Sequence, residues 1–185
     1  MFVSPAWAAS ENRTCPPGVR TRPLPPPVPD VLDPITVGWR EWIAFPEIGL
    51  PAVRAKVDTG AKTTALHAHD VTVETRGGEP WAQFSVHPFF RHERLTVACE
   101  APVVDDREVT SSSGHTETRI VVGVVLRLGV RSDAPEWPIE VTLTDRRGMR
   151  FPMLLGREAM AGRVLVDSGA SFLLGAPARP SALYT

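Results

Sequence analysis

One short segment carries residue types suited to hydrolytic chemistry. Residues 55–61 read Ala-Lys-Val-Asp-Thr-Gly-Ala, which places Asp58 at the end of a predicted strand. The Asp58 carboxylate can activate water, Gly60 allows a sharp turn with close N–H groups, and the Thr59 hydroxyl can brace the loop. Asp-x-Gly is also ordinary turn chemistry, so this string needs a second signal before it indicates a catalytic loop.

The second signal is an apolar run that ends in glycine. Residues 151–160 read Phe-Pro-Met-Leu-Leu-Gly-Arg-Glu-Ala-Met, so a strand containing Leu154 and Leu155 reaches Gly156, and Arg157 opens a short helix. A core strand followed by a helix start would also read this way. In order and spacing, however, the two segments resemble the retroviral-type aspartic proteases. In that group a hydrophobic-hydrophobic-Gly strand passes beside the catalytic loop and leads into Gly-Arg-acid.

Several further segments narrow the resemblance. Residues 37–42, 55–68, 86–88, 113–115 and 153–157 together are similar to a bacterial family labelled ATP-dependent zinc protease. Its members often accompany the RimK-type ligase that adds glutamates to a ribosomal protein, and the likeness covers about residues 36–177. It implies a retropepsin-like fold with Asp58, Thr59 and Gly60 as the catalytic loop. The residues that the resemblance implies as support are Ala61, Leu154, Leu155, Gly156 and Arg157. The chain has no Gly-x4-Gly-Lys-Ser/Thr loop for ATP, and we expect no cofactor.

The pattern around these segments predicts strands that would hold them in place. Short runs rich in Val, Ile, Thr and aromatic residues alternate with Gly, Pro and Asp clusters, which is typical of all-β folds. We expect strands at 36–45, 53–57, 64–73, 81–87, 94–99, 116–130, 137–144 and 151–155. Hairpin turns are expected at 76–79 and 145–148, and a helix at 157–161. The predicted fold is an all-β, closed retropepsin-like (acid protease) barrel with one short C-terminal helix.

Composition sets the domain boundaries and the expected partners. Nine of the 19 prolines lie in residues 1–34, which predicts a disordered arm before a domain at 35–178 and a tail at 179–185. The net charge of −1 gives no reason to expect nucleic acid, and no apolar run is long enough to span a membrane. Two cysteines and a weak match to a signal peptide favour a cytoplasmic protein.

An aspartic mechanism needs two carboxylates, and this chain offers one convincing loop. The string Asp167-Ser168-Gly169 lies near the C-terminus with no later strand to support it, so we interpret Asp167 as a turn residue. The second aspartate is then expected from the Asp58 loop of a twofold-related chain, which predicts a homodimer that cleaves peptide or glutamyl isopeptide bonds. Lys62 replaces an acidic residue usual in retroviral enzymes, so Arg157 needs another partner, with Glu158 or Asp70 as candidates.

Two other functions remain open at this point. The domain could bind and regulate a RimK-type glutamate ligase without hydrolysis. A zinc-dependent protease could instead use His67 and His69, which share a strand face, together with His115, although ligand spacing of a known type is missing. Histidines 87 and 92 are further candidates. Ser113, Gly114 and His115 also form a polar loop, which makes them a candidate flap over the cleft.

The proline-rich arm generates the first testable prediction. Removing residues 1–34 should leave the fold intact, because a segment so rich in proline contributes little to a core. The truncated protein is expected to keep one cooperative thermal transition, with a melting temperature close to that of the full chain. Aggregation, or a melting temperature lowered by 10 °C or more (roughly 2 kcal/mol), would contradict this expectation.

Overall fold

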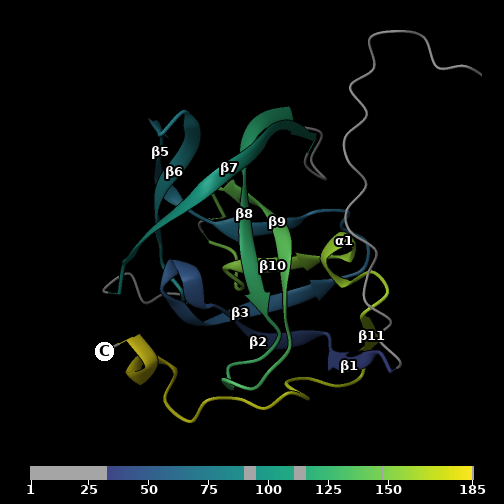
Figure 1. Ribbon diagram of the computed structural model, residues 1–185. Coiled ribbons are helices and arrows are strands. Elements are labelled where there is room, and N and C mark those ends of the chain that lie inside the picture. The colour runs from purple at the N-terminus through teal and green to yellow at the C-terminus, as the bar shows by residue number, and fades with distance from the viewer. Residues whose placement is uncertain (1–32, 90–94, 111–115, 147, 185) are drawn as a thin grey trace, which may run out of the picture. The chain divides into compact units, whose positions relative to one another are not determined.

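The computed structural model describes residues 33–89, 95–110, 116–146 and 148–184, and the fold is all-β (Figure 1). Eleven strands are present in the described residues, with one α-helix and two short 3-10 helices. In chain order they are β1 (Ile35–Gly38), β2 (Arg40–Phe45), η1 (Pro46–Ile48), β3 (Leu50–Asp58), β4 (Thr64–His67), β5 (His69–Arg76), β6 (Glu79–Val86), β7 (Val97–Thr110), β8 (Thr116–Arg127), β9 (Glu136–Thr144), β10 (Met153–Gly156), α1 (Arg157–Met160), β11 (Val164–Asp167) and η2 (Pro180–Tyr184). The predicted all-β class with one short helix is confirmed.

Nine of the strands form one sheet that closes on itself. Their order is β2-β3-β10-β4-β9-β8-β7-β6-β5, and β2 also pairs with β8 through Ala44 and Arg127. That extra pairing makes a ring of six strands, from which β7, β6 and β5 extend. Strands β1 and β11 form a separate parallel pair. The closed arrangement agrees with the predicted closed retropepsin-like fold.

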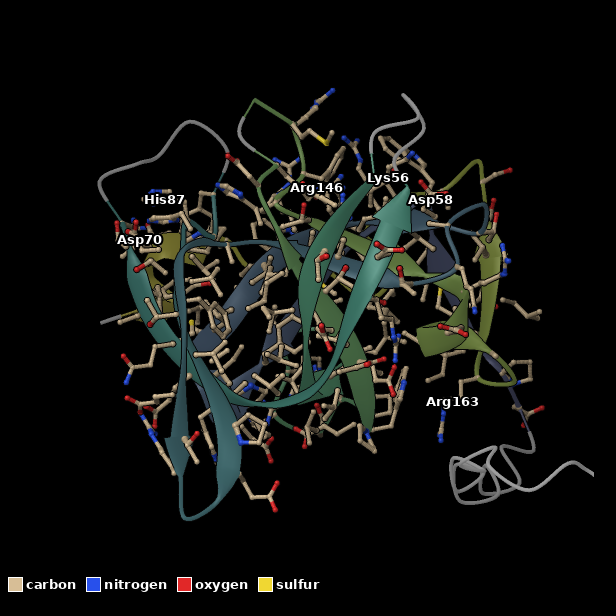
Figure 2. The ribbon with its side chains drawn as sticks, turned by 90° about the horizontal axis from the view of Figure 1, so that it is seen from above. Lys56, Asp58, Asp70, His87, Arg146 and Arg163 are labelled. Carbon is tan, nitrogen blue, oxygen red and sulfur yellow. The ribbon has the colours of Figure 1, made fainter. Side chains whose placement is uncertain are left out.

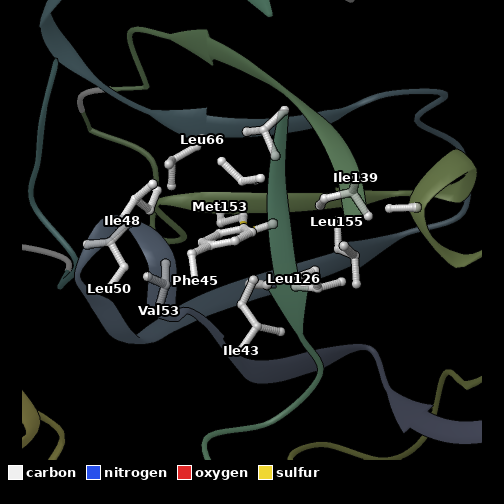
Figure 3. Close-up of a cluster of buried hydrophobic side chains, with 14 of the residues drawn as sticks. Ile43, Phe45, Ile48, Leu50, Val53, Leu66, Leu126, Ile139, Met153 and Leu155 are labelled. Atoms are coloured by element: carbon white, nitrogen blue, oxygen red, sulfur yellow. The ribbon is translucent and has the colours of Figure 1, made fainter. Parts of the chain in front are cut away.

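The ring encloses the hydrophobic core (Figure 3). Phe45, Leu126 and Met153 are fully or almost fully buried and come from three different strands of the ring. Buried and more exposed residues alternate along the second half of β3, whereas β2, β4 and β10 are buried at almost every position. Large core side chains shown in the figure include Ile43, Ile48, Leu50, Val53, Leu66, Ile139 and Leu155.

Most predicted strands are present, but the structure corrects their lengths. The predicted strand at 36–45 is divided between β1 and β2 at Trp39, and that at 64–73 between β4 and β5. Strand β7 continues to Thr110, well past the predicted 94–99, because it pairs with β6 first and β8 afterwards. Strand β11 was not predicted, because it has only four residues and leads directly into a sequence typical of a turn.

One predicted hairpin is right and the other is wrong. At 76–79, Gly77 and Gly78 both have positive φ, and they join β5 to β6 as a hairpin. The segment at 145–148 does not form a hairpin between β9 and β10, because β4 lies between those two strands. Strand β10 is needed beside β3, so the chain must cross over β4 to reach that place.

The C-terminal end of the chain returns to the ring. Residues 180–184 form η2, and the Tyr184 hydroxyl donates a hydrogen bond to the carbonyl of Ala52 in β3. Burial raises the pKa of that phenol above its ordinary value. Among the described residues no helix is both long and apolar enough to cross a bilayer.

Two glycines are required by close backbone crossings, and they generate a prediction. A Cβ on Gly156 would lie 2.4 Å from the carbonyl of Thr63, and a Cβ on Gly38 would lie 2.5 Å from the carbonyl oxygen of Ala170. Backbone cannot yield as a side-chain tip can, so Gly156→Ala and Gly38→Ala should each lower the free energy of unfolding by about 3 kcal/mol or more. Urea denaturation measures this loss.

Gly169→Ala is the matched control, because its Cβ would meet its nearest neighbour, a side-chain oxygen, at an ordinary 3.4 Å. Its free energy of unfolding should change by less than about 1 kcal/mol, because Gly169 is not among the glycines with positive φ and alanine is compatible with its backbone. Equal losses in all three variants would show that the crossings are not tight.

Candidate functional site

Asp58 is the last residue of β3, and its carboxylate is held by the turn that follows. Oδ1 accepts hydrogen bonds from the backbone N–H groups of Gly60 (3.1 Å) and Ala61 (3.2 Å). The Ala61 N–H also approaches the Asp58 carbonyl at 3.3 Å. These amides bind Oδ1 and do not contact Oδ2, the second oxygen of the carboxylate. The side chain is 23% exposed, so another group can reach it from the surface.

The predicted crossing strand does lie beside this turn. Strand β10 runs parallel to β3, with Leu155 opposite Val57 and Gly156 opposite Asp58, and it pairs with β4 on its other side. The helix that follows donates back to the turn, with Arg157 N–H to the Ala61 carbonyl (3.0 Å) and Glu158 N–H to the Lys62 carbonyl (3.2 Å). The turn after Asp58 is therefore fixed by backbone hydrogen bonds from the chain segment predicted to support it.

Side chains complete the support, in part differently from expectation. The Gly156 N–H donates to Thr64 Oγ1 (3.2 Å), so Thr64 braces the loop. Thr59 is exposed, and the described residues offer its hydroxyl no hydrogen-bond partner. Arg157 donates from Nη1 to the Gly60 carbonyl (3.2 Å), so the partner that the structure shows for it is a backbone group of the turn. Glu158 is instead 3.7 Å from Lys62 Nζ, with both groups well exposed.

Lys56 is a member of the site that the sequence analysis did not select. Its Nζ donates to Asp58 Oδ2 at 3.0 Å. This hydrogen bond, with the charge of Lys56 and the two backbone amides, holds the pKa of Asp58 below its ordinary value, against the opposing effect of burial. Strand alternation could have found Lys56, because residues i and i+2 of a strand share a face.

A cavity of about 920 Å³ lies on the same side of the molecule (Figure 2). It is lined by the start of β5, the start of β8 and the segment between β9 and β10, and includes His67, His69, His87, Arg119 and Arg146. Figure 2 shows Arg146 between His87 and the Lys56–Asp58 pair. Burial, and then the charge of Arg119, lower the pKa of Arg146, while the charge of Asp58 raises it. Arg146 thus links the cavity electrostatically to Asp58.

Three histidines meet in this cavity as a stack. The ring centroids of His69 and His87 are 4.4 Å apart with the planes 18° from parallel, and His67 lies 6.0 Å from His69. His67 Nδ1 accepts the Arg146 N–H at 2.9 Å, and burial lowers the His67 pKa, which favours the neutral ring. His87 Nδ1 is 3.2 Å from the Leu95 carbonyl oxygen.

This stack bears on the zinc alternative. Imidazole binds a metal through a lone pair in the plane of the ring, so rings stacked in parallel do not direct their lone pairs to one point. Within the described residues no group of three His, Cys, Asp or Glu side chains is arranged to hold a metal ion. His92 and His115 lie outside the described residues, as do Ser113, Gly114 and the rest of the candidate flap. Strand β7 ends at Thr110 and strand β8 begins at Thr116, and these two residues pair with each other.

Asp167 forms a turn that repeats the Asp58 turn. Asp167 Oδ1 accepts the Gly169 N–H at 2.8 Å, and the Ala170 N–H approaches the Asp167 carbonyl at 3.3 Å. Strand β1 runs parallel to β11 and places Gly38 opposite Asp167, as β10 places Gly156 opposite Asp58. Asp167 was predicted to lack a supporting strand because none follows it in the sequence, but the strand that supports its turn is β1, at the start of the domain.

The Lys56–Asp58 pair generates a prediction about protonation. In Lys56→Met the pKa of Asp58 should rise, because the hydrogen bond that favours the charged carboxylate is removed. A carboxyl group whose pKa is lowered by folding stabilises the fold at pH values above its unfolded-state pKa. This stabilisation is lost as the pH falls through the folded-state pKa, so the Lys56→Met variant should lose less stability in acid than the parent protein. Carbon-13 NMR of the Asp58 carboxyl measures the pKa, and Arg131→Met is the control. An unchanged Asp58 pKa in Lys56→Met would contradict the pairing.

Comparisons with known proteins agree with this geometry. A protein from Shewanella pealeana named "Probable alpha-L-glutamate ligase" is 45% identical over 139 residues, which are 75% of this chain and 30% of that protein. A protein of the same name from Parasynechococcus marenigrum is 48% identical over 141 residues, 76% of this chain and 29% of that protein. The chain therefore corresponds to less than a third of these relatives.

A solved structure and a family profile describe the matched part. The crystal structure of Lpg0085 from Legionella pneumophila, a protein of unknown function, superposes with a TM-score of 0.63 at 28% identity. The match covers 75% of this chain and 97% of that one. Residues 36–177 match the RimB-like profile, described as the retropepsin-like aspartic endopeptidase RimB. The Asp58 turn and its crossing strand lie inside that match, and the chain belongs to the RimB-like family of retropepsin-like proteins.

Proposed function

We propose that this protein is an aspartic-type peptidase in which Asp58 activates the attacking water. The observation that carries the proposal is the Asp58 turn itself. Two backbone amides bind one carboxylate oxygen, and strand β10 pairs with β3 up to Asp58, which fixes the start of the turn. A carboxylate oriented in this way and kept ionised by its neighbours is suited to accept a proton from water.

The second carboxylate of the proposed mechanism comes from Asp58 of a second chain. Two carboxylates about 3 Å apart cannot both ionise, so they share one proton and titrate as a pair. The ionised member takes a proton from water while the water oxygen adds to the substrate carbonyl carbon, and the protonated member donates to the carbonyl oxygen. The tetrahedral intermediate then breaks its C–N bond, and the nitrogen leaves as an amine after taking up a proton. The exposure of Asp58 on the surface supports this use of a partner chain.

The proposed substrates are peptide bonds or glutamyl isopeptide bonds. The relatives that contain a matching region bear the name of a glutamate ligase, which forms bonds of this general type. A hydrolase domain in such a protein would act on the ligase's product. For this chain we propose a RimK-type ligase as a partner.

A second candidate function is regulation of such a ligase without hydrolysis. Lys56 favours it, because its ammonium occupies the carboxylate oxygen that would face the second aspartate. In that case Asp58 and Lys56 would form a structural pair, and the domain would serve binding alone. Replacing Asp58 separates the two functions.

The decisive experiment compares two aspartates with similar turns. Asp58→Asn is nearly isosteric but cannot share a proton, so it should abolish turnover of glutamyl peptides and change stability by only about 1 kcal/mol. Asp167→Asn keeps an acceptor for the Gly169 N–H and should leave turnover nearly intact. Peptide hydrolysis and thermal unfolding are measured on both. Full activity of Asp58→Asn would overturn the peptidase proposal, and loss of activity in Asp167→Asn instead would move the catalytic role to that turn.

Mixed subunits test the shared dyad within the same experiment. If each active centre needs Asp58 from two chains, excess Asp58→Asn protein should suppress the activity of the wild-type protein after subunit exchange. Sedimentation should show a dimer under the assay conditions. A fully active monomer would exclude the two-chain dyad.

A further inference from the structure

Strand β5 lies at the open end of the nine-stranded sheet (Figure 1). The ring closes because β2 pairs with β8, whereas β5 pairs only with β6 within the described residues. Backbone N–H and C=O groups on the other side of β5 are therefore open to a further strand, and a sheet edge of this kind is a template for pairing with another chain. This edge has no part in the peptidase mechanism proposed above.

The hairpin that contains β5 shows which residues face the free edge. A two-residue turn at 77–78 joins β5 to β6, and in such hairpins the residues that flank the turn are hydrogen-bonded to each other. Hydrogen-bonded and non-hydrogen-bonded pairs then alternate along the strands. Val73 and Thr75 fall in non-hydrogen-bonded pairs, and the partner of Thr75 is Pro80, which has no N–H to donate. The N–H and C=O groups of Val73 and Thr75 therefore point away from β6, to the free edge.

The side chains of β5 divide into a charged face and an apolar face. Glu74 and Arg76 point to one face, where Arg76 also forms an ion pair with Glu100. Val73 points to the other face together with its cross-strand partner Ala82, which is fully buried in the core. Val73 is nevertheless 49% exposed, because β5 is the last strand of the sheet. The apolar layer of the core thus ends at a half-exposed valine.

This part of β5 lacks the devices that usually keep edge strands apart. Such devices are lysine or proline on the edge, a charge on the apolar face, or a bulge that twists the strand away. Residues 71–75 read Val-Thr-Val-Glu-Thr and carry no charge on the face of Val73. The ladder with β6 is irregular only at the start of β5, where Asp70 has a positive φ. The rest of the strand is regular and open to pairing.

We propose that β5 pairs antiparallel with β5 of a second copy of this chain, in a register centred on Val73. The two Val73 residues then face each other, exchange their outward N–H and C=O groups, and continue the apolar layer from one copy to the next. Thr75 faces Val71 of the second copy. Figure 2 shows Asp70, at the start of β5, on the other side of the molecule from Asp58, so this interface is separate from the proposed dyad.

Charge complementarity favours a second copy as the occupant and selects the register. Centred on Val73, the ladder places Glu74 opposite the uncharged Thr72 and Asp70 opposite Arg76, so no like charges face each other. A ladder centred on Glu74 would oppose two Glu74 carboxylates, and one centred on Thr72 would oppose Glu74 to Asp70. Both would be destabilised by repulsion. The strand is therefore complementary to itself in one register, and the interface is isologous.

The test places a charge at the centre of the proposed ladder in the full-length protein. Val73→Lys would oppose two ammonium groups and Val73→Glu two carboxylates, so neither variant should pair with itself. Sedimentation velocity over a concentration series up to about 0.5 mM measures the weight-average mass. We expect the wild-type mass to be about twice that of either variant. This ratio holds whether or not the Asp58 loops also pair, because the substitutions leave those loops unchanged.

Mixing the two variants separates lost pairing from lost folding. An equimolar mixture of Val73→Lys and Val73→Glu should regain the wild-type mass, since an ammonium then faces a carboxylate, whereas misfolded variants would not be rescued by mixing. Val104→Lys is the matched control, because Val104 is 51% exposed and lies on β7, which β6 separates from β5. Its mass should equal that of the wild type. A wild-type mass no greater than that of the variants, no recovery in the mixture, or an equal loss in Val104→Lys would overturn the pairing.

Discussion

The rest of the site depends on one close backbone crossing. Gly156 passes so near the carbonyl of Thr63 that any Cβ would overlap it, and this contact lets β10 lie between β3 and β4. From there the following helix donates its first amides to the carbonyls of Ala61 and Lys62. An aspartate at the end of an unsupported strand would sample many orientations. The crossing instead fixes the turn, and with it the orientation of the Asp58 carboxylate.

The protein uses this device twice. Gly38 of β1 crosses the Asp167 turn as Gly156 crosses the Asp58 turn, and each aspartate accepts the N–H of the glycine two residues later. Their surroundings differ, however. Asp58 has Lys56 as an ion-pair partner and Arg146 as a nearby charge, whereas Asp167 is exposed at the end of a two-stranded sheet. The turn itself is therefore a structural element that the chain uses twice, and within the described residues charged side-chain partners are shown for the Asp58 turn.

Sequence reasoning succeeded where the signal was local. The Asp58 string, the Leu154-Leu155-Gly156 run and the strand pattern predicted the closed all-β fold and the strand beside the turn. It failed where the signal depends on distant segments. No local pattern shows that β10 must enter between β3 and β4, so 145–148 resembled a hairpin turn. Likewise, Arg146 and the stacked histidines come together only through the fold, and β1 supports the Asp167 turn from the other end of the domain.

Lys56 is central to the catalytic proposal. While its ammonium stays 3.0 Å from Asp58 Oδ2, it favours the ionised carboxylate and fills the position where a second carboxylate would share a proton. A working dyad therefore requires Lys56 to move. Its side chain is 47% exposed and flexible, and Arg40 beside it adds a like charge that weakens its hold on this site. A second Asp58 carboxylate that approaches this oxygen would itself offer Lys56 another partner, so formation of the proposed dyad and displacement of Lys56 would be coupled.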